Sequence, residues 1–303
     1  MRLLLRTVCR LGVIPGSLSY QAIEKWGHRL ARGPLDCRLF TGAKVRCDLR
    51  DHVQRQMYFF GAHELVEAYL FKAVLGPGMV VVDAGANVGQ YSLIAAAEVG
   101  GEGAVHAFEP VPRTFMRLVS HLEANGLTGI VRANSEALWH RDEPVRLSLR
   151  SELAENTAAY SVAAASMTVD TITCRGVRLD DYVKRGGLTR VDVMKIDIEG
   201  AELFALQGAT EVLARWRPMI FIELSRYTCN AVGYDPQRIL EFVKPYGYEG
   251  WLIGDSPGAC RRIHDLTGVD FANVILHANP LPEHVTAGWS VRGILRRSRE
   301  YRV

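Results

Sequence analysis

The stretch VVVDAGANVGQYSLIAA, residues 80–96, decides the fold of this chain. An apolar run ends on Asp83, a turn with Gly85 and Gly89 follows, and a helical pattern then begins. In this order a buried strand, a glycine-containing turn and a helix form the first unit of a parallel sheet, with a nucleotide-like ligand on the turn. The dinucleotide spacing G-x-G-x-x-G is absent, because Asn87 stands where its second glycine would be.

The alternation of strands and helices continues along the chain. We expect strands at 79–83, 104–110, 130–134, 191–197 and 218–224, helices at 63–75, 88–99, 112–125, 200–214 and 236–244, and an antiparallel pair at 248–253 and 272–278. Strands that alternate with helices of this length predict an α/β fold, with a mostly parallel sheet covered by helices on both faces.

The domain organisation follows from where this pattern starts, changes and stops. We predict an N-terminal extension over 1–56 (a helix at 15–32 and a hairpin at 37–49), one domain over 57–278, and a basic tail over 279–303. Within the domain, a period of two between 144 and 180 predicts an inserted antiparallel ribbon.

The composition is that of an ordinary globular protein. The 303 residues are 48% hydrophobic and 23% charged, and the net charge of +3 gives no reason to expect nucleic acid as a partner. Six scattered cysteines form no CxxC pair, so neither a zinc site nor a redox motif is indicated. Isolated thiols are typical of a reducing compartment, so we expect a cytoplasmic protein.

Both ends of the chain are basic. Arg6 and Arg10 interrupt the apolar run of MRLLLRTVCRLGVIPG (1–16), which is therefore no signal peptide and is too short to span a bilayer. A basic amphipathic helix on a membrane surface is one interpretation, and a helix that is solvated or packed on the domain is the one we favour. The segment RGILRRSREYRV (292–303) likewise permits contact with an anionic membrane, although a frayed tail is the default.

Asp83 indicates the charge of the ligand. A carboxylate directly before the turn would repel a pyrophosphate, but it suits a ligand with positive charge. S-adenosylmethionine carries a sulfonium and an ammonium group and no phosphate. The alternative is that Asp83 interacts only with the N-terminus of the following helix.

Glu109 ends the second strand of the pattern, 26 residues after Asp83. A carboxylate there can accept both hydroxyls of a ribose, a contact that any adenosine ligand would make. Ser135 and Glu136 follow the third strand and are candidates for the adenine edge. Polar loop residues also occupy such places without a ligand.

A second group of acids follows the strand in VDVMKIDIEGAEL, residues 191–203. Asp197 and Glu199 share one face of the extended segment, and Glu223 ends the next strand. Three converging carboxylates raise one another's pKa, as in a general base or a metal site. Alternatively, Asp197 and Glu199 cap the next helix and Glu223 pairs with Arg226.

Taken together, the motifs VVVDAGANVGQYS, FEPVP, LDDYV and VMKIDIEGAEL, with LQGA and RPMIFIEL after them, resemble the FkbM family of S-adenosylmethionine-dependent methyltransferases. The resemblance covers roughly residues 57–225, with weaker support to about 278. It implies a class I methyltransferase fold, with seven strands of which the last is antiparallel. It also implies methylation of hydroxyl oxygens on sugars, glycans, glycolipids or other natural products.

The resemblance also implies roles for single residues. The methionine part of the cofactor would lie against Asp83, Gly85, Asn87 and Gly89. The ribose would lie on Glu109, with Asp197 and Glu199 facing the methyl group and the acceptor. The segment YFFGAHE (58–64) resembles the stretch that precedes the first family motif, so we expect Glu64 near the cofactor.

The expected reaction is an in-line displacement in which the protein mainly aligns the two reactants. A carboxylate takes the proton of the acceptor hydroxyl, and Asp197 is the first candidate, Glu199 the second and Glu223 the third. A Mg²⁺ ion bound by these acids is an alternative that we do not favour, because acidic pairs more often cap helices or form ion pairs.

Two other classes of function stay open. A nucleotide-dependent oxidoreductase or epimerase would need a glycine at 87 and room for a pyrophosphate, and both Asn87 and Asp83 argue against it. A non-catalytic protein that keeps the fold and only binds would tend to lose some of its site acids, whereas those at 83, 109, 197 and 199 are all present.

Overall fold

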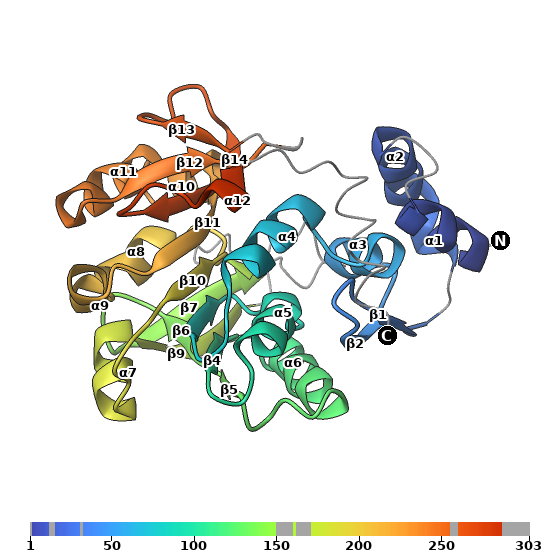
Figure 1. Ribbon diagram of the computed structural model, residues 1–303, viewed down its shortest axis with the longest axis horizontal. Coiled ribbons are helices and arrows are strands. Elements are labelled where there is room, and N and C mark those ends of the chain that lie inside the picture. Colours follow the sequence, from blue (N-terminus) through green and yellow to red (C-terminus); the bar gives the residue numbers. More distant parts are fainter. Residues whose placement is uncertain are drawn as a thin grey trace.

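The computed structural model describes residues 2–11, 16–30, 33–149, 160–161, 171–254 and 260–286. Figure 1 shows a central sheet with the strand order β13-β12-β14-β11-β10-β3-β4-β5. Its strands are β3 (Val80–Ala84), β4 (Ala104–Phe108), β5 (Val131–Asn134), β10 (Val193–Ile196), β11 (Met219–Ser225), β12 (Glu249–Leu252), β13 (Arg261–Ile263) and β14 (Phe271–His277).

The pairing confirms the predicted fold class. Strands β5, β4, β3, β10 and β11 are parallel to one another, and β14 lies antiparallel between β11 and β12. The sheet has eight strands rather than the expected seven, because β13 pairs with β12 at the edge. Strand β13 has three residues, Arg-Arg-Ile, which are too few and too polar to show a strand pattern.

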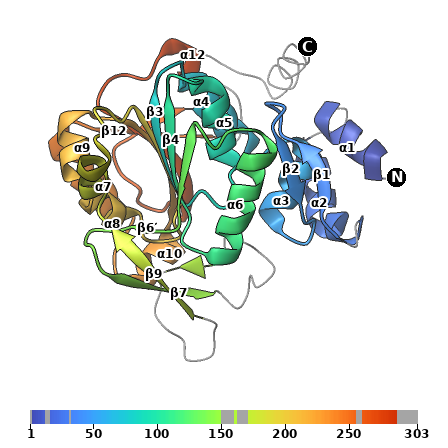
Figure 2. The ribbon, with the colours of Figure 1, turned by 90° about the horizontal axis from the view of Figure 1, so that it is seen from below.

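Helices cover both faces of this sheet, as Figure 2 shows from below, with α4 to α6 on one side and α7 to α9 on the other. The bounds are α4 (Leu65–Val74), α5 (Gln90–Val99), α6 (Pro112–Ala124), α7 (Leu179–Gly186), α8 (Glu202–Gln207), α9 (Thr210–Arg215), α10 (Arg226–Ala231), α11 (Gln237–Val243), the 3₁₀ turn η3 (Lys244–Tyr246) and α12 (Glu283–Thr286). Among the described residues, no helix is long and apolar enough to cross a membrane.

The expected helix over 200–214 is two helices, α8 and α9. A Cβ atom on Gly208 would lie 2.1 Å from the carbonyl oxygen of Trp139, so only glycine fits at the break between them. The close approach comes from a distant segment, and local sequence does not reveal it.

The inserted ribbon is present where the structure describes it. Strands β7 (Pro144–Leu149) and β9 (Thr171–Val177) pair antiparallel, and the short strands β6 (Ala137–Leu138) and β8 (Tyr160–Ser161) complete a second sheet. The predicted ribbon residues 150–159 and 162–170, and tail residues 287–303, lie outside the described part.

The N-terminal extension packs on the domain. It comprises α1 (Arg2–Leu11), α2 (Gly16–Trp26), the 3₁₀ turn η1 (Gly27–Leu30), β1 (Leu35–Arg38), β2 (Lys44–Cys47) and α3 (His52–Phe60). The hairpin is confirmed by the antiparallel pairing of β1 with β2. The sequence did not predict α3, because its residues 53–59 are all buried and therefore show no amphipathic period.

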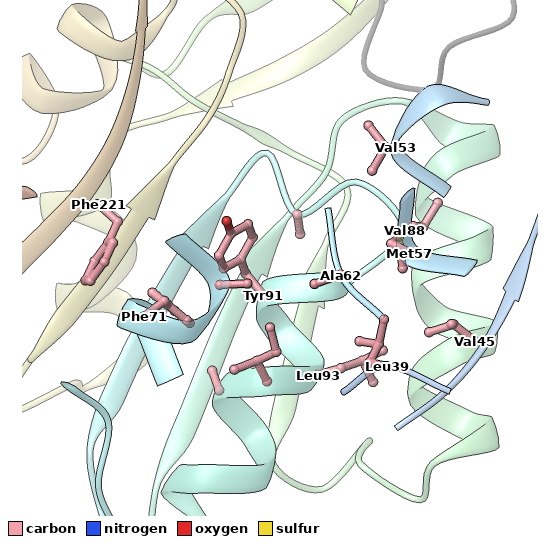
Figure 3. Close-up of a cluster of buried hydrophobic side chains, with 14 of the residues drawn as sticks. Leu39, Val45, Val53, Met57, Ala62, Phe71, Val88, Tyr91, Leu93 and Phe221 are labelled. Carbon is pink, nitrogen blue, oxygen red and sulfur yellow. The ribbon is translucent and has the colours of Figure 1, made fainter. Parts of the chain in front are cut away.

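The extension and the domain share one hydrophobic core. Leu39 and Val45 of the hairpin belong to the same buried cluster as Leu93 of α5 and Phe221 of β11. Figure 3 shows these side chains between the extension and the sheet. The extension is therefore fixed against the domain, and its residues Tyr20, His52 and Gln56 reach the site described next.

Candidate active site

A cavity of about 650 Å³ opens at the carboxyl ends of β3, β4, β10 and β11. Seven acidic residues line it, namely Glu64, Glu67, Glu109, Glu136, Asp197, Glu199 and Glu223. The described lining residues include no lysine or arginine. This is the edge at which open parallel sheets bind their ligands, and the negative lining favours a ligand with positive charge.

The turn after β3 packs closely against the loop after β10 and is hydrogen-bonded to Glu109. Gly85 has φ +80°, and a Cβ atom there would lie 1.8 Å from the carbonyl oxygen of Asp197. Asn87 has φ 50°, and its backbone N–H donates to Glu109 Oε2 at 2.9 Å. Gly85 and Asn87 line the cavity, whereas Gly89, at φ +98° directly before α5, does not.

Glu109 is buried, and both its carboxylate oxygens accept backbone hydrogen bonds. Oε2 accepts from Asn87, and Oε1 accepts from Val111 N–H at 2.9 Å. Burial raises the pKa of Glu109 to about 7, although these two hydrogen bonds oppose the shift. Each oxygen keeps a lone pair, so the carboxylate can still accept a ligand hydroxyl.

Asp83 lies behind the turn and does not line the cavity. It is fully buried, and its Oδ2 accepts a hydrogen bond of 2.5 Å from the Ser92 hydroxyl of α5. Its Oδ1 has no hydrogen-bond partner among the described residues. Burial raises the pKa of Asp83 to about 6. Its neighbour in register on β10 is Lys195.

Among the described residues, Lys195 is the one buried lysine. Its Nζ lies 2.9 Å from Glu67 Oε1 and 3.7 Å from Asp197 Oδ2, and also 4.9 Å from the Tyr91 ring centre. Burial alone would lower the pKa of Lys195, but the carboxylates of Glu67 and Asp197 outweigh it and raise the pKa. Lys195 therefore stays charged.

Three carboxylates, that of Asp197 among them, lie close together near this lysine. Oxygen atoms of Glu64, Asp197 and Glu223 lie within 4.8 Å of one another, a spacing that could hold a divalent cation. Glu64 Oε1 accepts from Asn273 Nδ2 at 2.6 Å, while its buried Oε2 has no partner among the described residues. Burial and the charges of Asp197 and Glu64 raise the pKa of Glu223 well above its usual range. A cation bound here would offset the repulsion among these carboxylates.

The loop after β10 presents Glu199 to the cavity. Glu199 has φ 52°, and the buried carboxylate of Glu202 accepts from the backbone N–H groups of Ile198 at 3.2 Å and Gly200 at 3.0 Å. The Tyr234 hydroxyl lies 3.1 Å from Glu202 Oε2. Glu202 is thus the residue that fixes the shape of this loop.

Backbone strain is concentrated at the cavity. Four non-glycine residues in the described part of the chain have positive φ, and three of them, Glu64, Asn87 and Glu199, line it. Such conformations cost about 1–3 kcal/mol each and cluster at functional sites.

Of the two residues proposed for the adenine edge, only Glu136 lines the cavity. Its Oε1 lies 3.3 Å from Arg175 Nη1 of β9, and Ser135 is not part of the lining. The apolar wall on this side comes from Trp139 and from Val145 of the inserted ribbon.

The N-terminal extension and the short loop after α3 contribute polar residues that the sequence reasoning missed. Tyr20, His52, Gln56 and His63 line the cavity together with the apolar residues Val53 and Phe60. His52 and Gln56 are four residues apart on α3, a spacing that would have placed them on one face had the helix been predicted.

These polar groups form a hydrogen-bonded relay. His52 Nδ1 lies 2.8 Å from Glu24 Oε2, so the other ring nitrogen, Nε2, accepts from Gln56 Nε2 at 3.0 Å. Gln56 Oε1 then accepts from His63 Nδ1 at 3.0 Å. Burial lowers the pKa of His63 to about 4, so its ring is neutral and Nε2 is its unprotonated nitrogen.

The strand order defines the class of protein. Five parallel strands, an antiparallel β14 inserted before β12, and a ligand cavity at the carboxyl edge make this a class I methyltransferase-type α/β fold. The family model "Methyltransferase FkbM domain" matches residues 83–249, more than half of the chain. The chain belongs to the FkbM methyltransferase family.

Curated relatives agree with this assignment. The chain is 30% identical over 162 residues to the 31-O-demethyl-FK506 methyltransferase FkbM of Streptomyces tacrolimicus, covering 45% of this chain and 62% of that protein. It is 30% identical over 139 residues to the hexuronic acid methyltransferase AglP of Haloferax volcanii, covering 44% and 51%. The matches thus span roughly half to three fifths of these relatives' lengths.

Among solved structures, the chain is similar to the precorrin-6y C5,15-methyltransferase of Geobacter metallireducens. The TM-score is 0.42 at 13% identity, and the match covers 71% of this chain and 88% of that one. It is also similar to TYW2 of P. horikoshii in complex with MeSAdo, with a TM-score of 0.42 at 16% identity and coverage of 82% and 73%.

Proposed function

We propose that this protein binds S-adenosylmethionine and transfers its methyl group to a hydroxyl oxygen of a small-molecule or glycan acceptor. The observation that carries the proposal is the charge of the cavity, which has seven acidic lining residues and no described lysine or arginine. A pyrophosphate would be repelled there, whereas the sulfonium and ammonium groups of S-adenosylmethionine would offset the excess negative charge. Membership of the FkbM methyltransferase family supports the same cofactor.

The residues present fit this cofactor. Glu109, ordered by the N–H groups of Asn87 and Val111, would hold the ribose hydroxyls. The turn at Gly85 and Asn87 lines the cavity, so it would take the methionine part. Glu136 would face the adenine.

Excess carboxylate charge would hold the cationic part of the cofactor. The unpartnered Glu64 Oε2 suits its ammonium group. Asp83 and Gly89 would act from behind the turn, since neither lines the cavity.

The cofactor supplies an activated methyl group whose leaving group is a neutral thioether. The chain's own residues then have two tasks, to align the acceptor hydroxyl and to remove its proton. We assign proton removal to Asp197, with Glu199 as the second candidate, because both face the cavity from the loop after β10. Lys195 Nζ lies 3.7 Å from Asp197 Oδ2 and is the cation next to this carboxylate.

Two observations support the proposed class of acceptor, namely the names of two relatives and the polar residues that line the cavity. The names of two relatives specify a hexuronic acid and an FK506 precursor as substrates, and both kinds of compound carry hydroxyl groups. The polar relay of His52, Gln56 and His63 at the cavity offers hydrogen-bonding partners for such an acceptor.

Isothermal titration with S-adenosylmethionine and, separately, with NAD tests the cofactor. We expect binding of the first alone, weakened at least about tenfold by Glu109→Ala, since loss of a hydrogen bond to a charged group costs about 1.5–3 kcal/mol. Glu123→Ala, an exposed acid on α6, is the matched control and keeps the affinity. Binding of NAD in place of S-adenosylmethionine would overturn the proposal.

A screen of hydroxylated acceptors with methyl-labelled S-adenosylmethionine tests the reaction. We expect label in the acceptor as a methyl ether, and a loss of about 10²–10⁴-fold in kcat for Asp197→Asn with the cofactor affinity largely kept. If Glu199→Gln shows that loss and Asp197→Asn does not, the roles of the two acids are exchanged. Cofactor binding without transfer to any acceptor would favour a protein that only binds.

A further inference from the structure

Helix α1 packs on the domain through Leu5 and Cys9, which join the shared core, and also through two of its arginines. Arg10 Nη2 donates to the carbonyl oxygens of Arg38 at 2.8 Å, Met57 at 3.2 Å and Tyr58 at 3.0 Å. The Arg6 guanidinium lies 4.7 Å from the centre of the Tyr58 ring.

Two leucines of α1 do not pack on the domain. Leu3 and Leu4 are 65% and 69% exposed. Seven large hydrophobic side chains in the described part of the chain are exposed, and four of them lie within residues 2–30, namely Leu3, Leu4, Tyr20 and Trp26. Both views show α1 and α2 together at one end of the molecule, away from the sheet (Figures 1 and 2). The extension therefore concentrates exposed apolar groups on one part of the protein.

The same extension is strongly basic. Residues 1–50 contain ten lysines and arginines and three aspartates and glutamates, whereas the remainder of the chain has more acidic than basic residues. Trp26, 49% exposed, lies beneath two cations, with Arg29 at 4.8 Å and Lys25 at 5.5 Å from its ring centre. An exposed tryptophan among basic side chains is typical of the boundary between water and lipid headgroups.

We propose that α1 and α2 dock this protein on an anionic membrane surface, with Leu3, Leu4 and Trp26 entering the headgroup region. The leucines supply apolar contact and the basic residues of the extension attract anionic headgroups. A second copy of the chain is disfavoured as the occupant, because it would bring two strongly basic surfaces together. Tyr20 of α2 also lines the cavity, so the docking surface reaches the edge of the site. The proposal does not depend on methyl transfer.

Co-sedimentation of the full chain with vesicles tests the proposal. The probes are vesicles of phosphatidylcholine alone and vesicles that also contain phosphatidylglycerol, each at low and at high salt. We expect the protein to pellet with the anionic vesicles and to be released by salt. Replacement of both leucines, Leu3→Glu with Leu4→Glu, should lower the partition coefficient at least about tenfold, because each buried CH₂ contributes about 0.8 kcal/mol.

Met116→Glu is the matched control, since Met116 of α6 is equally exposed, at 65%, but lies outside the extension. It should sediment as the wild type does. Thermal melting of each variant shows whether it folds, and Trp26→Ala with Arg29→Gln gives a second test that leaves α1 intact. The proposal is overturned if the wild-type chain ignores anionic vesicles, if the double leucine variant binds them unchanged, or if the leucines prove to mediate self-association instead.

Discussion

Lys195 Nζ lies 2.9 Å from Glu67 Oε1, and both side chains are 1% exposed. This pair joins β10 of the sheet to α4 and lies directly behind the carboxylates of the cavity. It anchors the acidic site to the core and supplies the one buried ammonium that the surrounding carboxylates share.

Removing that ammonium should destabilise the fold. For Lys195→Met we expect the free energy of unfolding to fall by about 3–5 kcal/mol, because the carboxylate of Glu67 is left buried without a counterion. Urea denaturation measures the change. The double variant Lys195→Met with Glu67→Leu should be more stable than the sum of the single effects predicts. Lys184→Met, which breaks the exposed pair with Glu211, is the control and should leave the midpoint unchanged.

The turn after β3 should tolerate no side chain at Gly85. Gly85→Ala combines positive φ with a Cβ atom 1.8 Å from a backbone oxygen, so we expect destabilisation of more than about 4 kcal/mol and loss of cofactor binding. Gly78→Ala is the matched control, because Gly78 has φ +75° but nothing within 4 Å of the added atom. Its free energy of unfolding should fall by only about 1–2 kcal/mol, the cost of a positive φ for alanine. Equal melting temperatures for the two variants would contradict the close contact.

Glu109 should make the stability of the unliganded protein depend on pH. Its pKa is raised to about 7 in the folded state, above the value of about 4.3 in an unfolded chain. Between these values the folded state binds more protons, so its contribution to stability is present at low pH and is lost as pH rises toward 7.

The Glu109→Gln variant isolates this effect. Relative to wild type, it should gain about 3 kcal/mol of stability between about pH 4.5 and pH 7.5, since the amide does not titrate. Denaturant melts across this range measure the difference, with Glu123→Gln as the reference for an exposed position. If the stability difference between Glu109→Gln and the wild type does not change with pH, the pKa of Glu109 is not raised in the folded protein.

His63 should be a neutral ring with its proton on Nδ1. Its Nδ1 lies 3.0 Å from Gln56 Oε1, and burial lowers its pKa to about 4. Long-range ¹H–¹⁵N correlation spectra should therefore show an unprotonated Nε2 at pH 6 and above, where an exposed histidine would be partly charged. Gln56→Leu removes the acceptor and should abolish the tautomer preference. A protonated Nε2 in the wild type would exclude the relay.

Much of this protein was predictable from local sequence. The strand that ends on Asp83, the glycine turn and the following helix predicted the parallel sheet, because strand and helix periods are properties of short segments. The same patterns predicted acidic residues at the ends of strands. The carboxyl ends of parallel strands meet at one edge of a sheet, and the four acids so predicted line one cavity there, namely Glu109, Asp197, Glu199 and Glu223.

Tertiary structure decided what surrounds those acids. Asp83 appeared to be a ligand contact in the sequence, yet the packing of α5 buries it against Ser92, because a residue's exposure depends on distant elements. Lys195 and Glu67 are 128 residues apart, and no local pattern could pair them. Helix α3 and the hydrogen bonds of His52, Gln56 and His63 were not predicted from the sequence, because a helix that is buried on all sides shows no amphipathic period. The sequence by itself determined the class of fold and the edge that carries the site, while contacts between distant segments determined which charges are buried, paired or open to the cavity.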